Sequence, residues 1–363
     1  MNCKAYIISA SLLLWSMAAT GQQVTDSKTL RKSFSTEGEV NIDVTNKYGN
    51  IHISHSKSDS VTIRVEVEAS SDNESKLKGM MSGVDVSITK SENTIVATTE
   101  VGKSVNSFLE SFKGLTRSFI NYDTRLQINY FIVCPARAIL RIENSYGDVY
   151  ITDRTPELSL TLANGSLDAG VIDNVKQMTL TFCKAEIKTV RKGQITLNYG
   201  EMKCDSAVSI SLVARASKAR IEWAGAIDLD SKRDDITIEE VGIIRGSSYF
   251  SDIKVSSLKK EAGLATKYGN FSVNSLDAAF SLIDLNTSYT DVDFYVEAKS
   301  SYDLEIRHTN AFVSLPGITP EPERTTVNAE SKIYLTSGKY GNSPDNSRIR
   351  IEATRGEIRI VQK

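Results

Sequence analysis

The chain has little of what most enzyme and metal sites are built from. Its 363 residues include only three histidines, His52, His55 and His308. So few histidines argue against a histidine-based zinc site or a nucleophilic triad. The sequence also has no Gly-x-Ser-x-Gly elbow, no phosphate-binding glycine loop and no His-Glu-x-x-His motif. We expect no catalytic residues, no metal and no cofactor, and hence a protein that is not an enzyme.

Cysteine is scarce as well. Of the four present, Cys3 falls in the leader segment described below, which leaves Cys134, Cys183 and Cys204. An odd number of cysteines in an exported chain leaves at least one thiol free, so we do not expect a disulfide scaffold.

Neither sign of charge is in large excess. Loss of a leader that contains Lys4 lowers the basic residues from 43 to 42 against 45 acidic ones, a formal charge of −3. Nucleic acid binding requires a concentrated basic surface, so nucleic acid is not an expected partner.

Long hydrophobic runs are absent after the first residues. The mostly apolar stretch 5–19 follows Lys4 and precedes Ala19-Thr20-Gly21, which resembles a small-residue cleavage site. We therefore expect 1–21 to be a signal peptide. The stretch is too short to cross a membrane comfortably, so no transmembrane segment is expected. The mature chain should be exported, and either soluble or loosely attached to the envelope.

What the chain does have is a repeat, clearest in Tyr146-Gly147-Asp148-Val149-Tyr150-Ile151. An anchor residue, often aromatic, is followed by a small residue and then by an apolar pair three and five positions after the anchor. The anchors lie 17 to 21 residues apart. Further copies are anchored at Asn164, Phe182, Tyr199, Ala216, Arg233, Phe250, Tyr268, Tyr289 and His308. A fixed period of this length indicates stacked repeats.

A second alternating run precedes many anchors, which implies at least two strands per coil. A sandwich of antiparallel hairpins would also give short strands, but its loops tolerate variable lengths. The near-constant spacing favours an all-β solenoid, a single-stranded β-helix with roughly 18 residues per coil. Ten such coils would make a rod on the order of 48 Å long.

The segments outside the repeat predict additions to this rod. Residues 22–135 are rich in period-two runs and include a copy of the motif at Tyr48. A short helix is expected near 73–81. An amphipathic helix over 103–120 would be a lid on the open end of the solenoid or, alternatively, a membrane-surface or partner-docking helix. After the array at 136–315, we expect a proline-rich loop and capping strands at 316–363.

Stacking turns each motif position into a row along the rod. The small residue after the anchor indicates a tight corner that needs positive φ or a close backbone approach. The next position becomes a run of carboxylates and amides at Asp235, Asp252, Asn270 and Asp291. Such a row could bind a cation or a sugar, or it could satisfy the backbone at the corner.

Two further sets of side chains have open interpretations. Aromatic anchors such as Tyr268 and Tyr289 could bind sugar faces or peptides, or could pack against one another. Asp234, Asp235 and Asp252 would be the first residues to consider for a paired-carboxylate glycosidase. Acids in a repeating register are, however, what a solenoid produces in any case.

Several of these features together resemble a known family. They are the signal peptide, the Tyr-Gly copies at Tyr48, Tyr146, Tyr199 and Tyr268, and the strand that leads into Cys134-Pro135. The family consists of exported bacterial proteins, common in Bacteroidetes, that are named "putative adhesins". The resemblance implies a right-handed β-solenoid in the periplasm or on the cell surface, and it offers no catalytic or binding residues to transfer.

The leading interpretation is a non-enzymatic envelope protein whose solenoid presents an extended interaction surface. Its expected partner is an envelope protein or a cell-surface glycan. The alternative is a polysaccharide-binding or polysaccharide-cleaving β-helix protein. The sequence does not indicate an oligomeric state.

Overall fold

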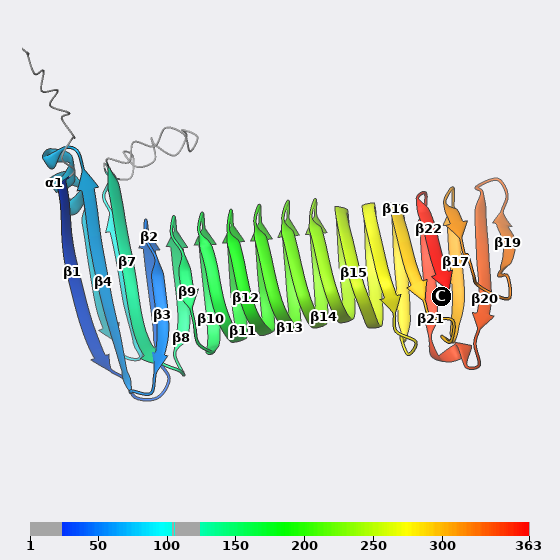
Figure 1. The fold of residues 1–363 in the computed structure, drawn as a ribbon, viewed down its shortest axis with the longest axis horizontal. Coiled ribbons are helices and arrows are strands. Elements are labelled where there is room, and N and C mark those ends of the chain that lie inside the picture. The colour runs from blue at the N-terminus through cyan, green and yellow to red at the C-terminus, as the bar shows by residue number, and fades with distance from the viewer. Residues whose placement is uncertain (1–23, 104, 106–123, 363) are drawn as a thin grey trace, which may run out of the picture.

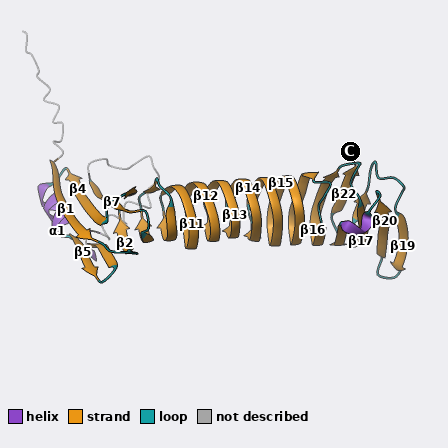
Figure 2. Cartoon of the chain, turned by 90° about the horizontal axis from the view of Figure 1, so that it is seen from below, coloured by secondary structure: helices purple, strands orange, loops and turns teal. Residues whose placement is uncertain are grey.

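The strands of this chain stack into one long rod (Figures 1 and 2). The computed structural model describes residues 24–103, 105 and 124–362, and their strands form a single 22-stranded sheet wound along the rod. The signal peptide expected at 1–21 lies outside the described residues. So does the amphipathic helix expected over 103–120, apart from Lys103 and Val105.

The regular middle of the rod is a β-solenoid. Its strands are β8 (Ile139–Ser145), β9 (Val149–Ile151), β10 (Thr155–Ala163), β11 (Ser166–Thr181), β12 (Lys184–Asn198), β13 (Glu201–Arg215), β14 (Lys218–Lys232), β15 (Asp235–Leu276) and β16 (Leu282–Val296). Each pairs in parallel with the strand one coil further on, as in Ser166↔Lys184 and Lys184↔Glu201. A sandwich of hairpins would pair neighbours antiparallel, so this register confirms the all-β solenoid. The right-handed winding implied by the resemblance stays a prediction.

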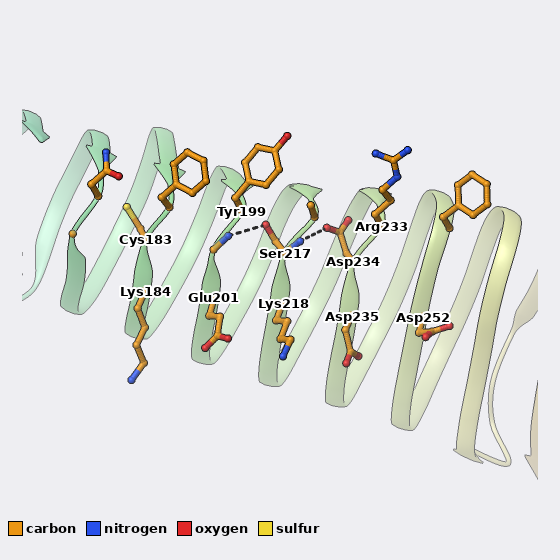
Figure 3. Close-up of a pocket in the computed structure, with 16 residues that line it drawn as sticks. Cys183, Lys184, Tyr199, Glu201, Ser217, Lys218, Arg233, Asp234, Asp235 and Asp252 are labelled. Carbon is orange, nitrogen blue, oxygen red and sulfur yellow. Dashed lines mark hydrogen bonds between the residues drawn. The ribbon is translucent and has the colours of Figure 1, made fainter. Parts of the chain in front are cut away.

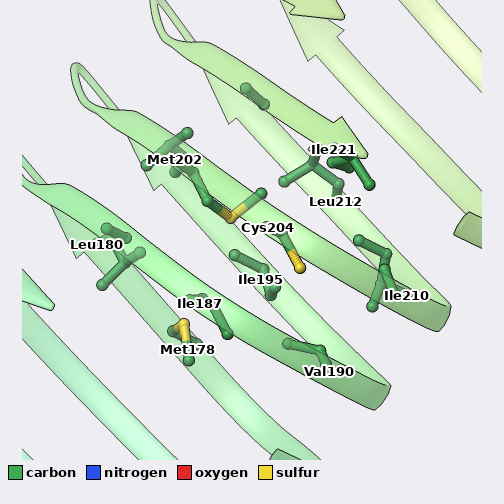
Figure 4. Packing of buried hydrophobic residues seen from close by; sticks show 14 of the residues in the cluster. Met178, Leu180, Ile187, Val190, Ile195, Met202, Cys204, Ile210, Leu212 and Ile221 are labelled. Atoms are coloured by element: carbon green, nitrogen blue, oxygen red, sulfur yellow. The ribbon is translucent and has the colours of Figure 1, made fainter. Parts of the chain in front are cut away.

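Alternating side chains fill the interior of the coil. Leu167 and Ala169, the apolar pair after one corner, are both buried, and the pairs of the following coils lie above them. Ile187, from after a corner, and Ile195, from the run before the next corner, belong to one continuous core (Figure 4). The predicted apolar positions thus face inward because successive residues of a strand point to opposite sides.

Each anchor in the regular array adopts the left-handed backbone conformation. The φ angle is 62° at Tyr146, 57° at Asn164 and 55° at Phe182. It is also positive at Tyr48, Tyr199, Ala216, Arg233, Phe250, Tyr268 and Tyr289. A residue with a Cβ adopts this conformation at a cost of roughly 1–2 kcal/mol, so the corner imposes it on tyrosine and phenylalanine against their preference.

The residue after the anchor is small because backbone from the neighbouring coil lies close to it. A Cβ on Gly147 would lie 2.0 Å from the carbonyl oxygen of Gly49, and one on Gly165 would lie 2.0 Å from that of Gly147. Neither glycine has positive φ. At these two corners positive φ belongs to the anchor, and close backbone approach belongs to the residue after it. At Gly269 and Gly356 the residue after the anchor has both features, with φ angles of 149° and 95°.

The N-terminal part contributes the first coil and closes its end of the rod. Its elements are β1 (Val24–Ser35), β2 (Asn41–Lys47), β3 (Ile51–Ser56), β4 (Ser60–Ser71), α1 (Glu74–Ser82), β5 (Val84–Ser91), β6 (Thr94–Val101) and β7 (Arg125–Pro135). β2 pairs in parallel with β8, and β3 with β9, so the Tyr48 copy lies directly beside the Tyr146 copy. The segment 57–138 is an insertion between these two coils.

That insertion forms the outer layers. β6 and β7 pair in parallel with the free edges of β2 and β3, and β4 and β1 then continue from β7 in antiparallel order. The short helix expected near 73–81 is confirmed as α1, where Asn73 Oδ1 accepts the Lys76 N–H at 3.1 Å as an N-cap. No helix among the described residues is long and apolar enough to cross a bilayer.

At the C-terminal end the stacking order departs from the chain order. The elements are β17 (Tyr302–Thr309), β18 (Phe312–Ser314), β19 (Glu323–Asn328), β20 (Ile333–Tyr340), the 3-10 turn η1 (Pro344–Asn346), β21 (Arg348–Thr354) and β22 (Glu357–Gln362). β16 pairs with β21 and β22, and β17 and β18 lie on their far side. β20 and β19 follow in antiparallel order as the outermost strands.

This insertion corrects the last copy of the repeat. Ser288 and Thr309 both pair with Thr354, so Arg355 and then Asn310 continue the anchor row after Tyr289. Their φ angles are 60° and 51°. The anchor placed at His308 is therefore wrong by two residues. A copy at Arg355-Gly356 was missed because the period alone could not show that β21 and β22 return to lie between β16 and β17.

The close approach at the corner can be tested with one methyl group. Gly165→Ala should lower the free energy of unfolding by roughly 2 kcal/mol or more, because its Cβ would collide with backbone that is held in the sheet. The matched control is Gly79→Ala in α1, where a Cβ meets nothing within 4 Å and alanine favours the helix. Urea unfolding followed by circular dichroism measures both; equal midpoints for the two variants would contradict this account.

Candidate functional site

A hollow of about 1080 Å³ runs along the corner of the solenoid. It has three rows of side chains (Figure 3): the anchors point outward, the residues after them form the floor, and the residues two after the anchors form the opposite side. The anchors are Asn164, Phe182, Tyr199, Ala216, Arg233 and Phe250, the floor is Gly165, Cys183, Gly200, Ser217 and Asp234, and the opposite side is Lys184, Glu201, Lys218, Asp235 and Asp252.

The floor links successive coils by hydrogen bonds to side chains. The Gly200 N–H donates to Ser217 Oγ at 3.2 Å, and the Ser217 N–H donates to Asp234 Oδ1 at 2.8 Å (Figure 3). In the next coil the Asp234 N–H donates to Ser251 Oγ at 3.1 Å. Backbone groups at the corner are satisfied in this way, which buried amides require.

Asp234 is occupied within the fold. Its side chain is 5% exposed, and Oδ2 accepts from the Ser231 hydroxyl at 2.7 Å and from the Lys232 N–H at 2.6 Å. Burial raises the pKa of its carboxyl above the ordinary value, and the hydrogen bonds partly oppose this shift. With both oxygens bonded inside the corner, Asp234 is a structural residue and not half of a catalytic carboxylate pair.

The anchor row is a ladder of stacked rings with a gap in it. Phe182 and Tyr199 stack with centroids 5.1 Å apart, and Phe250 and Tyr268 stack at 4.7 Å. Between these pairs lie Ala216, which has no ring, and Arg233, whose guanidinium makes no hydrogen bond or ion pair with any described residue. Tyr199 is 60% exposed and Phe182 57%, so the ladder presents a large aromatic surface to solvent.

The residues singled out from the sequence are distributed over this corner. Asp235 and Asp252 line the hollow, and Asp252 Oδ1 accepts from the Asn270 amide at 2.6 Å. Asp291 Oδ1 accepts the Glu357 N–H at 2.8 Å, which is the backbone role proposed for this row. Their part in ligand binding stays a prediction.

Tyr268 and Tyr289 continue the ladder past the end of the hollow. Their ring centroids are 5.0 Å apart, and the Arg355 guanidinium covers Tyr289 at 4.8 Å. They pack against their neighbours, and neither lines the hollow.

The hollow includes Asp235 and Asp252 but lies earlier in the chain than the other four sequence candidates, Asn270, Asp291, Tyr268 and Tyr289. Phe182, Tyr199 and Arg233 were recognised as anchors but not as site residues. One feature of the sequence could have located the hollow: Ala216 is the smallest anchor, and it lies between Tyr199 and Arg233 in the row. Across the described residues, no three or more His, Cys, Asp or Glu side chains gather where they could hold a metal ion.

The described cysteine thiols are buried, and that of Cys183 is hydrogen-bonded to a backbone carbonyl. All three cysteines in the described part are free and buried. Burial raises the pKa of the Cys134 thiol to about 12 and that of Cys204 to about 11, so neither is a thiolate at neutral pH. On the floor, Cys183 Sγ lies 3.3 Å from the Leu162 carbonyl oxygen and 3.2 Å from that of Thr181, and its single S–H can donate to either.

The raised pKa of Asp234 predicts a pH-dependent contribution to stability. Between the ordinary aspartate pKa and the raised one, the folded state takes up a proton that the unfolded state does not. Wild type should therefore gain unfolding free energy relative to Asp234→Ser as the pH falls from 7 towards 4.5. Serine already occupies the same row at Ser217 and Ser251, which makes the variant compatible with the corner. Urea unfolding of both proteins across this range measures the difference, and a constant or falling difference would contradict the assignment.

Comparison with known proteins finds similar solved structures but no relative in sequence. No known protein family and no curated protein matches the chain in sequence. Among solved structures it is similar to "putative adhesins" from three Bacteroidetes. They are those of Parabacteroides distasonis (10% identity, TM-score 0.41, covering 74% of this chain and 97% of that one), Parabacteroides merdae (11%, 0.33, 74% and 95%) and Bacteroides fragilis (13%, 0.32, 73% and 96%). Likenesses with TM-scores this low support no conclusion about function.

Proposed function

We propose that this chain is a non-enzymatic, exported envelope protein, an adhesin or interaction scaffold that binds a linear glycan of a cell surface along the corner of its solenoid. The observation that supports this best is the hollow of about 1080 Å³ between the aromatic anchors and the charged row. The leader-like segment 1–21 supports export to the periplasm or the cell surface.

The walls of the hollow offer contacts that the fold does not use. The side chains of Glu201, Lys218 and Asp235 make no hydrogen bond or ion pair with other described residues. They alternate in charge from coil to coil and can hydrogen-bond the hydroxyls of a sugar chain. Tyr and Arg side chains, such as those of Tyr199 and Arg233, are among the kinds that dominate binding energy at interfaces.

The gap at Ala216 supplies a specific position for a ring. Tyr199 and Arg233 lie two coils apart, a separation of about 10 Å along the rod, and both point outward on the same side (Figure 3). A sugar ring inserted there would have the tyrosine face on one side and the guanidinium on the other. The sugar ring would occupy the position where Ala216 has no side-chain ring.

The length of the hollow suits a linear ligand. It reaches from the coil of Asn164 to that of Asp252, six levels of the anchor row. Contacts repeated at coil spacing favour a polymer that lies parallel to the rod. A protein strand from the envelope could lie along the same row and is the other occupant to test.

Binding is expected to depend on the two side chains that flank the gap. Tyr199→Ala combined with Arg233→Ala should weaken binding to an array of bacterial surface glycans by about tenfold or more, since truncation of a tyrosine or arginine that anchors an interface costs about 2 kcal/mol or more. The matched control is Phe312→Ala, which removes an equally exposed ring from β18, outside the hollow.

Three results would count against the proposal. Wild-type protein that binds no glycan on the array would remove its main support. Retention of an envelope protein in place of glycan would identify the other occupant. Release of reducing ends from a bound polysaccharide, lost in Asp235→Ala or Asp252→Ala, would establish the cleaving alternative instead.

A further inference from the structure

A second hollow, of about 520 Å³, lies on the other side of the anchor row. It is lined by residues that precede the anchors by one, two or three positions, on β13, β14, β15 and β16. Two small residues, Ser247 and Ala265, form its outward-facing base, and larger side chains rise around them. The depression follows from this difference in size within two adjacent rows.

The row that precedes the anchors becomes cationic here. On four successive coils it presents Arg215, Lys232, Tyr249 and Lys267, and all four line the hollow. Earlier coils carry Ala163, Thr181 and Asn198 at this position, and the next coil carries Ser288. The concentration of positive charge is therefore local, on a chain whose overall formal charge is −2.

Both lysines converge on one aromatic ring. The Lys232 Nζ lies 5.8 Å and the Lys267 Nζ 5.9 Å from the centroid of Tyr249. Tyr249 meets Phe250 and Tyr268 edge to face, at interplanar angles of 81° and 80°. The Tyr249 ring is thus turned out of the stack and remains 37% exposed, and the Lys267 Nζ also lies 5.3 Å from the centroid of Tyr268.

These charges are not neutralised by the fold. Asp230 is the one carboxylate among the residues that line the hollow, and Arg215 binds it at 2.6 Å through Nη2. The same guanidinium also donates to the Ala214 and Asp230 carbonyls. Neither Lys232 nor Lys267 forms an ion pair with any other described residue. Two free ammonium groups therefore face one concave surface.

We propose that this hollow binds the sulfate or carboxylate group of an acidic glycan. The ammonium groups of Lys232 and Lys267 supply charge-assisted contacts to the anionic oxygens. Tyr249 contacts the sugar that carries the group, and Ser247 and Asn286 offer polar atoms to its hydroxyls. This site goes beyond the proposed function because it does not require the hollow on the opposite side of the anchor row to be occupied.

A glycan fits this surface better than other anionic partners. Most residues that line the hollow are serine, threonine, asparagine, lysine or arginine, and Ala265 is the one aliphatic side chain among them, so the surface lacks the apolar face that enters a bilayer. A single short cationic cluster is also far from the extended basic surface that a nucleic acid backbone requires.

The experiment measures binding of the mature chain to immobilised dextran sulfate, carboxymethyl dextran and neutral dextran. Wild type should bind both charged polymers and not the neutral one. Lys232→Gln combined with Lys267→Gln should weaken binding by about tenfold or more, because it removes both charge-assisted contacts. Lys188→Gln combined with Lys254→Gln is the matched control: it removes the same charge from exposed positions outside this hollow and should change binding by less than twofold.

Two further arms identify what the site recognises. Tyr249→Leu should weaken binding of the charged polymers while leaving competition by inorganic sulfate unchanged. Adding Tyr199→Ala and Arg233→Ala should leave the fold-change caused by the Lys232/Lys267 substitutions unaltered, which separates this site from the one under proposed function. The proposal is overturned if the Lys232/Lys267 variant binds as wild type or no more weakly than its control. It is also overturned if the lysines are needed only for binding to vesicles of anionic phospholipid.

Discussion

The left-handed backbone at each corner is the constraint on which the rest of this structure depends. It turns the chain within about two residues, so that the strands before and after the corner lie on different walls of one coil. It also directs the anchor side chain outward, away from the core. Because the next coil must pass at sheet spacing, the residue after the anchor has its backbone against the carbonyl below, and glycine or a small side chain follows.

Stacked corners convert a local geometry into continuous surfaces. Equivalent positions repeat at the spacing of strands in a sheet, which is close enough for rings to stack and for one coil's side chain to bind the next coil's backbone. Tyr48 and Tyr146 stack at 5.6 Å although an inserted segment separates them in the chain. The fold tolerates any outward side chain, so it is the departures from the repeat that distinguish one stretch of surface from another: a missing ring at Ala216, and a run of cations around Tyr249.

The order of coils in space is freer than their order in the chain. Parallel pairing requires only that matching edges meet, so β2 and β3 can complete a coil beside β8 and β9 after a long excursion. For the same reason β21 and β22 lie between β16 and β17. Antiparallel strands then cover both ends of the rod, where an open parallel edge would otherwise template association with other chains.

The sequence by itself determined the coil. The spacing of Val149 and Ile151 after Tyr146, repeated at near-constant intervals, was sufficient to predict a solenoid with these residues inside. Strand periodicity and coil closure are local properties that each repeat carries in full. The sequence also indicated the corner and its small residue, but not the positive φ of the anchors. That conformation runs against the intrinsic preference of tyrosine and phenylalanine, and contacts with neighbouring coils impose it.

Only the tertiary structure decided which coils are neighbours and where the surface is hollow. His308 was placed in the anchor row because the period was followed along the chain, whereas pairing with β21 puts Asn310 there. The hollows depend on side chains from four or more coils and on which of them the fold already uses. Asp234 is held by three donors, while Lys232 and Lys267 remain unpaired. The bonded state of Asp234 and the unpaired state of the two lysines follow from contacts between residues on different coils. A single copy of the repeat contains no information about such contacts.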